Sequence, residues 1–427
     1  MNSKYPVRAL CDIAQRIDYG LTASATDASV GPRFLRITDI VPERLDWTTV
    51  PFCRTASDED RRKFALERGD IVIARTGATV GYSKFIRDAV DAVFASYLVR
   101  VRVNPGFDPS YVGYVVGSED YKDFVRSNAG GAAQPNANAR VLTSYLVPLP
   151  PLPTQHKIVG VLSAYDDLIE NNDGRIKLLE EMTRRIYREW FVDFRYPGHE
   201  TVPLVDSELG PVPKEWKVEP LGQLATLTKG LSYKGEYLTD SGIPMANLKC
   251  FDAAGGFRRE GTKPYSGPFK EKHSIRPGDL IVANTDLTQA GNVIGSPAIV
   301  PERGFENGGL VSHHLFVVRP RSLGISTAFV YQALRDDRAR SFARGRASGT
   351  TVLGLRTADY ERYPVLVPTA PLLRRFSDVA GSCLAQCGRL EDMLGMLRTT
   401  RDLLVPHLIS GTTEVGDLDI AVADAAA

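Results

Sequence analysis

Cysteine is scarce in this sequence of 427 residues, and no two cysteines have the CxxC spacing of a metal or redox site. The five cysteines are Cys11, Cys53, Cys250, Cys383 and Cys387. Their odd number argues against a disulfide scaffold and favours a reduced, cytoplasmic chain. Cys383 and Cys387 lie four residues apart on a predicted helix, where buried small side chains are a better interpretation than a metal site.

Long apolar runs are also missing. The opening stretch MNSKYPVRALCDIA lacks the apolar core of a signal peptide. No apolar run reaches the roughly 18 residues that a membrane-spanning helix needs. We therefore expect neither secretion nor a membrane span.

An excess of charge of either sign is absent, because 52 Lys and Arg balance 51 Asp and Glu. A nucleic-acid footprint would have to be a local basic patch. Catalytic motifs are missing too: GATVGYSK misplaces the lysine of a phosphate loop, and NPGF lacks the second proline of an adenine-methyltransferase loop. The six histidines show no metal-ligand spacing. We expect a chain that is not an enzyme and itself binds no metal or cofactor.

What the sequence does contain is a duplication. VRALCDIAQRIDYGL resembles VEPLGQLATLTKGL, and Val7 and Val218 lie 211 residues apart. ERGDIVIARTGATVG pairs with RPGDLIVANTDLTQAGNVIG at a separation of 209 residues. The proline-rich segments VPLPPLPTQHKIVGVL and VPTAPLLRRFSDVAGS pair at Pro148 and Pro368, 220 residues apart. Offsets this constant indicate two homologous halves.

Each half is expected to be a mixed α/β domain followed by a long helix. Segments such as DIVIA, YLVRVRV, DLIVAN and HLFVVRP are rich in β-branched residues and are bounded by turn signals, which is typical of strands. The predicted fold class is α+β, with two α/β domains in tandem. The predicted boundaries are a first domain over 1–150, a helix over 151–195, a second domain over 196–370, a helix over 371–411 and a flexible tail over 412–427.

The two predicted helices carry the same heptad seam. Apolar residues recur in an alternating four–three rhythm, and each seam position of the first helix has its counterpart 218 residues later. The seam residues are Ile158, Leu162, Tyr165, Ile169, Ile176, Leu179, Ile186, Phe376, Cys383, Cys387, Leu390, Leu394, Leu397 and Leu404. Asn172 is a polar member that could set the register. Because a domain lies between them in sequence, we expect the helices to form an antiparallel coiled coil.

These residues also resemble a known family. PLPPLPTQHKIVGVLSAYDDLIENNDGRIKLLEEMTRRIYREWFVDF resembles the central conserved region of the specificity subunits of Type I restriction-modification systems. SELGPVPKEWKVEPLGQLA resembles the opening of their second recognition domain, and LRTTRDLLVPHLISGTTEV is similar to their distal region. RGDIVIARTGATVG is similar to a strand and loop that recur in their recognition domains. The likeness extends over nearly the whole chain.

The resemblance implies a function. Each domain would be a target-recognition domain that reads one half of a bipartite, asymmetric target in double-stranded DNA. The helices would set the gap between the halves and dock two methyltransferase subunits, and endonuclease and translocase subunits would complete the complex. S-adenosylmethionine, ATP and Mg²⁺ would then belong to those partners. The second half departs from the first, with RRFSD in place of QHKIV and a longer loop, NTDLTQAGNVIG, in place of RTGATVG.

Candidate DNA contacts are polar and basic side chains in two loops of each half. Arg can pair with guanine and Asn or Gln with adenine, while Lys, Ser and Thr fix the backbone. The candidates in the first half are Arg75, Thr76, Asn128, Gln134, Asn136, Asn138 and Arg140. Those in the second half are Lys229, Lys234, Asn284, Arg344, Arg346, Ser348, Thr350 and Thr351. Ordinary turn formation is an alternative explanation for the Asn- and Gly-rich segment.

Two other functions fit the same sequence. The chain could be the recognition subunit of a related system whose partner combines methylase and nuclease. It could also be a coiled-coil scaffold whose domains bind something other than DNA. Salt-sensitive binding to duplex DNA would separate the scaffold from the other two.

Overall fold

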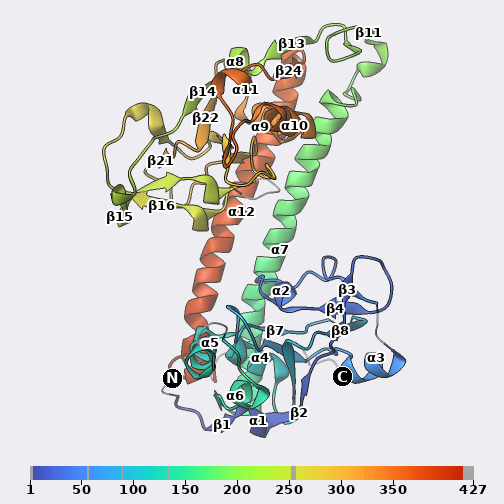
Figure 1. The fold of residues 1–427 in the computed structure, drawn as a ribbon, viewed down its shortest axis with the longest axis vertical. Helices are drawn as coiled ribbons and strands as arrows, with labels where there is room; N and C mark the ends of the chain where they lie inside the picture. Colours follow the sequence, from blue (N-terminus) through green and yellow to red (C-terminus); the bar gives the residue numbers. More distant parts are fainter. Residues whose placement is uncertain are drawn as a thin grey trace. The chain divides into compact units, whose positions relative to one another are not determined.

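The structure is a computed structural model that describes residues 3–54, 57–88, 90–131, 135–251, 256–322 and 324–416. It consists of two compact units (Figure 1). Unit 1 comprises Met1–Ile169 and Met396–Ala427, and unit 2 comprises Glu170–Gly395. The long helices α7 (Leu152–Phe191) and α12 (Ala370–Ser410) each contribute one part to each unit.

Unit 1 contains two four-stranded sheets. Its strands are β1 (Val7–Ala9), β2 (Ala14–Tyr19), β3 (Ala25–Thr26), β4 (Arg33–Leu35), β5 (Phe52–Cys53), β6 (Ile71–Ala74), β7 (Ser83–Phe85), β8 (Ala92–Phe94), β9 (Leu98–Val103) and β10 (Leu146–Pro148). Its shorter helices are α1 (Leu10–Ile13), α2 (Ile37–Ile40), α3 (Asp58–Phe64), α4 (Pro109–Gly117), α5 (Glu119–Asn128) and α6 (Ala139–Thr143). The sheets run β2-β9-β6-β7 and β3-β5-β4-β8, and β4 pairs with β8 in parallel.

Unit 2 repeats this plan. Its strands are β11 (Leu204–Val205), β12 (Val212–Pro213), β13 (Lys217–Pro220), β14 (Ala225–Lys229), β15 (Leu238–Ala246), β16 (Lys263–Tyr265), β17 (Ser274–Ile275), β18 (Leu280–Ala283), β19 (Thr285–Asp286), β20 (Pro297–Ile299), β21 (Gly309–Val311), β22 (Leu315–Pro320), β23 (Leu353–Gly354) and β24 (Pro364–Val367). Its shorter helices are α8 (Leu221–Leu224), α9 (Thr327–Arg335), α10 (Asp337–Arg346) and α11 (Thr357–Tyr360). The sheets run β14-β22-β18-β20 and β16-β15-β21-β17, with β15 parallel to β21.

The central strand of each unit is buried on both faces, which explains its continuous apolar sequence. In β6, Ile71 and Ile73 face one core cluster while Val72 and Ala74 face another. Successive side chains of a strand point to opposite faces, so one short run fills two cores. The strand β18 does the same in unit 2, with alternate residues in two separate clusters.

Within each unit, a part of α7 packs against a part of α12. In unit 1, Ile158 near the start of α7 shares a core with Leu408 near the end of α12. In unit 2, the rings of Phe191 and Phe376 lie 4.9 Å apart between centroids, at the end of α7 and the start of α12. The two helices therefore run antiparallel, and the predicted class of two mixed domains, each followed by a long paired helix, is confirmed.

One detail of the predicted repeat is wrong. In unit 1, β1 and β10 pair Val7 with Pro148, and in unit 2, β13 and β24 pair Val218 with Leu366. Since Val7 corresponds to Val218, Pro148 corresponds to Leu366 and not to Pro368. The proline-rich segments contain no periodic pattern that could fix their alignment to the residue. Within the described ranges, no helix has the length and apolar character needed to cross a bilayer.

Candidate nucleic-acid interface

The end of the buried strand β6 is held by backbone hydrogen bonds. The N–H of Arg75 donates to the carbonyl of Tyr97 at 3.0 Å, and the Arg75 carbonyl accepts from the N–H of Ala137 at 2.8 Å. The N–H of Gly20, which follows β2, donates to the carbonyl of Leu98 at 3.3 Å. These bonds fix four chain segments beside one another, independently of the side chains they carry.

The same bonds recur in unit 2. The N–H of Asn284 donates to the carbonyl of His314 at 2.9 Å, and the Asn284 carbonyl accepts from the N–H of Leu355 at 2.8 Å. The N–H of Gly230 donates to the carbonyl of Leu315 at 3.0 Å. We call three positions in each unit the frame positions. They are the residue before the glycine, the residue after the buried strand, and the residue whose carbonyl accepts from the N–H of that second residue. They are Tyr19, Arg75 and Tyr97 in unit 1 and Lys229, Asn284 and His314 in unit 2.

The glycines of the frame are needed for close approach of two chain segments. A Cβ on Gly20 would lie 2.3 Å from the carbonyl oxygen of Ala95, and a Cβ on Gly230 would lie 2.2 Å from that of Ser312. Real Cβ atoms do not come so close to a backbone oxygen, so any other residue would force the segments apart. The neighbouring frame positions, residues 19 and 229, are fixed in place as a result.

The side chains at the frame positions of unit 1 form an aromatic and basic cluster. The guanidinium of Arg75 lies over the ring of Tyr19, with 4.9 Å from Cζ to the ring centroid. The Arg75 Nε is buried and has no hydrogen-bond partner among the residues that the structure describes. Tyr19 accepts a hydrogen bond from the N–H of Ala139 at 2.9 Å and remains 43% exposed, while Tyr97 is 61% exposed. Exposed aromatic rings beside an arginine are typical of nucleic-acid surfaces.

The predicted amide-rich loop lies next to this cluster. Thr76 and Asn136 form an isolated β-bridge, and Asn136 forms a second bridge with Gly130. The bridge between Thr76 and Asn136 brings the candidates that follow β6 next to the candidates of the amide-rich loop. Asn136 is exposed and Thr76 is half-buried, so the Asn136 side chain is open to a ligand.

Two other amides of this loop serve local structure. The Asn138 side chain caps α6 by accepting from the N–H of Val141 at 3.0 Å. The Asn128 amide donates to the carbonyl of Phe124 at 2.8 Å, within α5. Arg140 is exposed, whereas Gln134 lies outside the described residues. The turn-forming alternative therefore accounts for the side chains of Asn128 and Asn138.

In unit 2 the frame asparagine has a structural role. Asn284 is only 2% exposed. Its amide donates to the carbonyl of His313 at 3.2 Å and accepts from the hydroxyl of Thr285 at 2.7 Å. The sequence predicts Asn284 as a DNA contact, but these two hydrogen bonds hold its side chain inside the domain. Burial lowers the pKa of His313 and of His314, which favours neutral rings at this place.

A cleft of about 420 Å³ opens beside the frame of unit 2. Lys229 and Ser348 line it, together with Arg356 and Thr357. Lys229 is exposed, so its ammonium group is available to a phosphate or a base. The candidate Lys234 is exposed and forms an ion pair with Glu236 at 3.7 Å.

The arginine-rich segment of unit 2, predicted as a loop, comprises the last turn of α10 and the loop after it, and the fold uses some of its side chains. The Nε of Arg344 donates to the carbonyl of Gly291 at 2.9 Å, and the guanidinium of Arg346 lies 3.6 Å from the ring centroid of Phe342. Ser348 forms a β-bridge with Gly354. The exposed candidates of this segment are Arg344 and Arg346 in α10 and Ser348, Thr350 and Thr351 after it. They form the basic and hydroxyl-rich edge that the near-zero net charge of the chain conceals.

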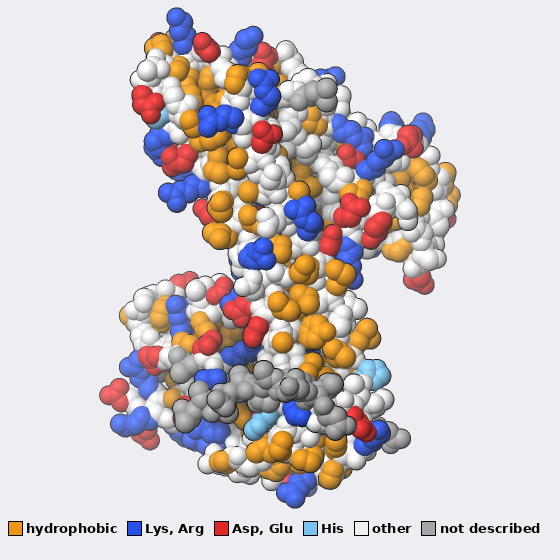
Figure 2. All heavy atoms as spheres, turned by 180° about the vertical axis from the view of Figure 1, so that it is seen from behind, with side chains coloured by type: hydrophobic (Ala, Val, Ile, Leu, Met, Phe, Trp, Pro, Cys, Tyr) orange, Lys and Arg blue, Asp and Glu red, His pale blue; other side chains and the backbone are white. Residues whose placement is uncertain are grey.

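The seam residues are buried or half-buried in both units. Ile158, Leu162 and Ile169 are buried on α7, and Tyr165, Ile176, Leu179 and Ile186 are half-buried. On α12, Phe376, Cys387, Leu390 and Leu394 are buried, and Cys383, Leu397 and Leu404 are half-buried. Asn172 is 4% exposed, and its amide nitrogen has no hydrogen-bond partner within the described ranges. Thr183 is a further buried seam residue that the sequence pattern missed. Hydrophobic side chains also remain exposed on the helices, as Figure 2 shows on one face.

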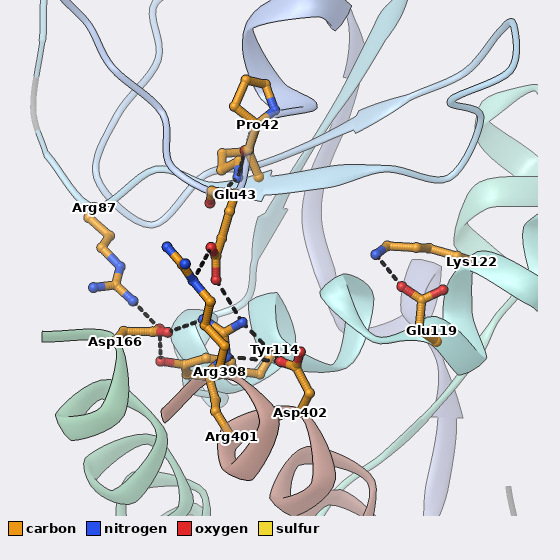
Figure 3. Close-up of polar contacts among 11 residues, drawn as sticks. Pro42, Glu43, Arg87, Tyr114, Glu119, Lys122, Asp166, Arg398, Arg401 and Asp402 are labelled. Carbon is orange, nitrogen blue, oxygen red and sulfur yellow. Dashed lines mark hydrogen bonds and ion pairs between the residues drawn. The ribbon is translucent and has the colours of Figure 1, made fainter. Parts of the chain in front are cut away.

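A network of ion pairs joins the two helices of unit 1 to the loop after α2, and we call it the unit 1 junction (Figure 3). Arg401 on α12 contacts Asp166 on α7 at 2.9 Å and Glu43 of the loop at 2.9 Å. Arg398, one turn earlier on α12, contacts Glu43 at 2.7 Å. The carboxylate of Glu43 thus forms ion pairs with two arginines of one helix.

Further polar groups close the unit 1 junction. The hydroxyl of Tyr114 donates to Asp166 at 2.6 Å, and Arg87 forms an ion pair with the same carboxylate. The ammonium group of Lys84 donates to the carbonyls of Pro42 and Glu43 at 2.7 Å each. Burial lowers the pKa of Lys84 to about 8, although Glu43 opposes the shift. The loop is therefore held at its backbone as well as at its carboxylate.

Unit 2 has a corresponding junction with the charges reversed, which we call the unit 2 junction. Arg259 contacts Asp392 on α12 at 2.6 Å and donates to the carbonyl of Arg303 at 2.9 Å. Burial raises the pKa of Glu391 to about 7, with Glu180 and Asp392 adding to the shift and Arg259 opposing it. In both units a loop of the domain is fixed to α12 by ion pairs.

Sequence reasoning missed several of these residues. The junction pairs lie far apart in sequence and follow no local pattern, so nothing in the sequence marks them. Tyr19 could have been found, because YGL and KGL occupy the same place in the two aligned halves. Within the described residues, no three His, Cys, Asp or Glu side chains cluster closely enough to hold a metal ion.

The fold and the repeated frame define a class: a duplicated protein in which two mixed α/β domains share a pair of long helices. Residues 42–181 match the family described as Type I restriction modification DNA specificity domain. The Type I restriction enzyme MjaIX specificity subunit of Methanocaldococcus jannaschii is 24% identical over 321 residues, which are 73% of this chain and 71% of that protein. The putative type I restriction enzyme MjaX specificity subunit of the same organism is 27% identical over 228 residues, 51% of this chain and 52% of that protein.

A solved structure has the same fold. The crystal structure of the Type I restriction-modification system S subunit from M. genitalium aligns with a TM-score of 0.59 at 14% identity. The alignment covers 95% of this chain and 96% of that one. In sequence, the chain is thus similar to type I restriction enzyme specificity subunits, and in fold it is similar to a solved S subunit.

Proposed function

We propose that this chain is the DNA-sequence specificity subunit of a Type I restriction-modification complex and performs no chemistry of its own. Each unit reads one half of a bipartite, asymmetric target in double-stranded DNA. The observation that carries this proposal is the frame, because identical backbone bonds hold Tyr19, Arg75 and Tyr97 in one unit and Lys229, Asn284 and His314 in the other. Two domains with the same main chain and different side chains are suited to reading two different half-sites.

The helix pair sets the gap between the half-sites and docks two methyltransferase subunits. Exposed apolar residues on the helices support docking, because contact of apolar side chains with water is unfavourable and exposed apolar surface often marks a protein interface. Leu178 and Met182 on α7 are 61% and 45% exposed in unit 2, and Met396 and Leu403 on α12 are 57% and 63% exposed in unit 1. Endonuclease and translocase subunits complete the complex. S-adenosylmethionine, ATP and Mg²⁺ belong to these partners.

The test is to lengthen both helices and map the methylated target. Seven residues are inserted after Ile169 and seven after Gly395, where α7 and α12 pass from one unit to the other. Seven residues preserve the heptad and extend a helix by roughly 10 Å, about three base pairs. The chain is co-expressed with its methyltransferase in a host without DNA methylation, and methylated adenines are mapped by single-molecule sequencing. We expect unchanged half-sites and a gap about three base pairs longer.

A three-residue insertion at each position is the control. Three residues break the heptad, so the seam no longer aligns and methylation should be lost. An unchanged gap with the seven-residue insertions would contradict the role of the helices. If the unaltered chain yields no bipartite methylated sequence, the proposed function itself is wrong. Methylation by the purified chain alone would contradict the non-catalytic role.

A further inference from the structure

Arg75 differs from the other arginines of its sheet. Arg16 and Arg100 each contact Asp18 at 2.7 Å, and Arg102 contacts Asp70 at 2.8 Å. Among the described residues, Arg75 has no carboxylate partner, and its Nε is buried without a hydrogen bond. Burying an arginine nitrogen without an acceptor is unfavourable. Because Arg75 is half-buried and has no carboxylate partner in the described part of the chain, the outer part of its guanidinium is open to an acceptor that arrives from outside.

The position of the Arg75 guanidinium is restricted. Its backbone is bonded on both sides, to Tyr97 and to Ala137, and its guanidinium lies over the ring of Tyr19. The hydroxyl of Tyr19 is in turn held by the N–H of Ala139. A planar group fixed in this way presents its donors in one orientation. Such fixation suits the recognition of two acceptors in a plane.

We propose that Arg75 reads a guanine in the half-site of unit 1, with Tyr19 as the residue that positions it. This inference rests on the proposed function. In the major groove, guanine presents O6 and N7 as two coplanar acceptors, which match the donor fork of arginine. Asn136 and Tyr97 are exposed beside Arg75 and complete a surface of hydrogen-bonding and aromatic groups around the base.

Unit 2 lacks this reader. Its equivalent residue, Asn284, is 2% exposed and its amide is bonded to His313 and Thr285. The exposed frame residue of unit 2 is Lys229, at the position of Tyr19. The two units therefore cannot read the same base from the same frame position. This difference explains how one backbone plan can serve an asymmetric target.

The test compares the methylated sequences produced by three variants, each co-expressed with the partner subunits in a host without DNA methylation. Arg75→Gln removes the fork, and Arg75→Lys keeps the charge but not the fork. Arg126→Gln is the matched control, because Arg126 is an exposed, ion-paired arginine of α5 in the same unit. We expect the original target to contain a G·C pair in one half-site that becomes degenerate in both Arg75 variants. Loss of one bidentate pair should reduce discrimination at that position roughly 5- to 150-fold.

The remaining positions of the target, the second half-site and the gap should not change, and Arg126→Gln should leave the whole target unaltered. The same target in wild type and both Arg75 variants would overturn the inference. So would a uniform loss of methylation in both variants, because that result indicates a phosphate contact or a structural role. If Arg75→Gln abolishes methylation but Arg75→Lys gives the degenerate position, the inference holds. A wild-type chain that directs no bipartite methylation contradicts the proposed function instead.

Discussion

Replacing Arg401 by methionine should weaken unit 1 and leave unit 2 intact. Arg401 is 17% exposed and contacts Asp166, which is 16% exposed, and Glu43. Each hydrogen bond between charged groups contributes about 1.5–3 kcal/mol, and removing one member of a buried pair costs about 3–5 kcal/mol. In the variant, Asp166 keeps its hydrogen bond from Tyr114 and Glu43 keeps its ion pair with Arg398. We therefore expect the free energy of unfolding of unit 1 to fall by about 2–3 kcal/mol, less than for a pair whose remaining member has no other partner.

The two units can be followed separately with 5-fluorotryptophan. Trp47 belongs to unit 1, whereas Trp190 and Trp216 belong to unit 2. Fluorine NMR in increasing urea then reports a midpoint for each unit. For a denaturant dependence of about 2–3 kcal/mol per molar, the Trp47 midpoint should fall by about 1 M. The midpoints of the two unit 2 tryptophans should not move.

Arg126→Met is the control for this experiment. Arg126 pairs with Asp123 at 2.8 Å, but both side chains are largely exposed, so its loss should cost less than about 1 kcal/mol. The reasoning is refuted if Arg401→Met shifts the Trp47 midpoint no further than Arg126→Met does. A double substitution of Arg401 and Asp166 should cost less than the sum of the two single ones, because they share one interaction.

Three further predictions concern unit 2. Because the pKa of Glu391 is raised to about 7 in the folded chain, the folded state keeps a proton that the unfolded state loses at lower pH. Stability should therefore fall as the pH rises towards 7, and Glu391→Gln should reduce this fall; parallel urea midpoints between pH 5 and 8 would contradict the assignment. Gly230→Ala should destabilise unit 2 by about 1–3 kcal/mol or more, since its Cβ would lie 2.2 Å from a backbone oxygen. Gly174→Ala, with open space around it on α7, should stabilise by about 0.5–1 kcal/mol in thermal unfolding.

The long helices could be predicted from sequence because their signal is periodic. The seams over residues 158–186 and 376–404 each repeat over many turns, and the two copies support each other at a constant offset. The structure places the helices at Leu152–Phe191 and Ala370–Ser410, within four residues of each predicted end. The duplicated strands after Asp70 and Asp279 were evident for a similar reason, since continuous apolar runs at a constant offset mark buried strands.

The candidate site was less predictable because burial is decided by tertiary structure. Arg75 and Asn284 occupy the same frame position, and both are polar residues after a buried strand. Only the structure shows that one stacks on an exposed ring while the other turns inward. The junction between Glu43 and Arg401 spans 358 residues, so no local pattern could reveal it. Apart from β15, the strands of the second sheet in each unit were equally hidden, because two or three residues carry no period.

The frame has a consequence for how such a protein changes over time. Its bonds run from main chain to main chain, so most substitutions at residues 19, 75, 97, 229 or 314 leave them in place. Under the proposed function, point mutations at these positions can alter the DNA sequence that is recognised without changing the fold of the domain. Asn284 is the exception, because its amide is itself part of the support, and drift at that residue should be slower than at its counterpart.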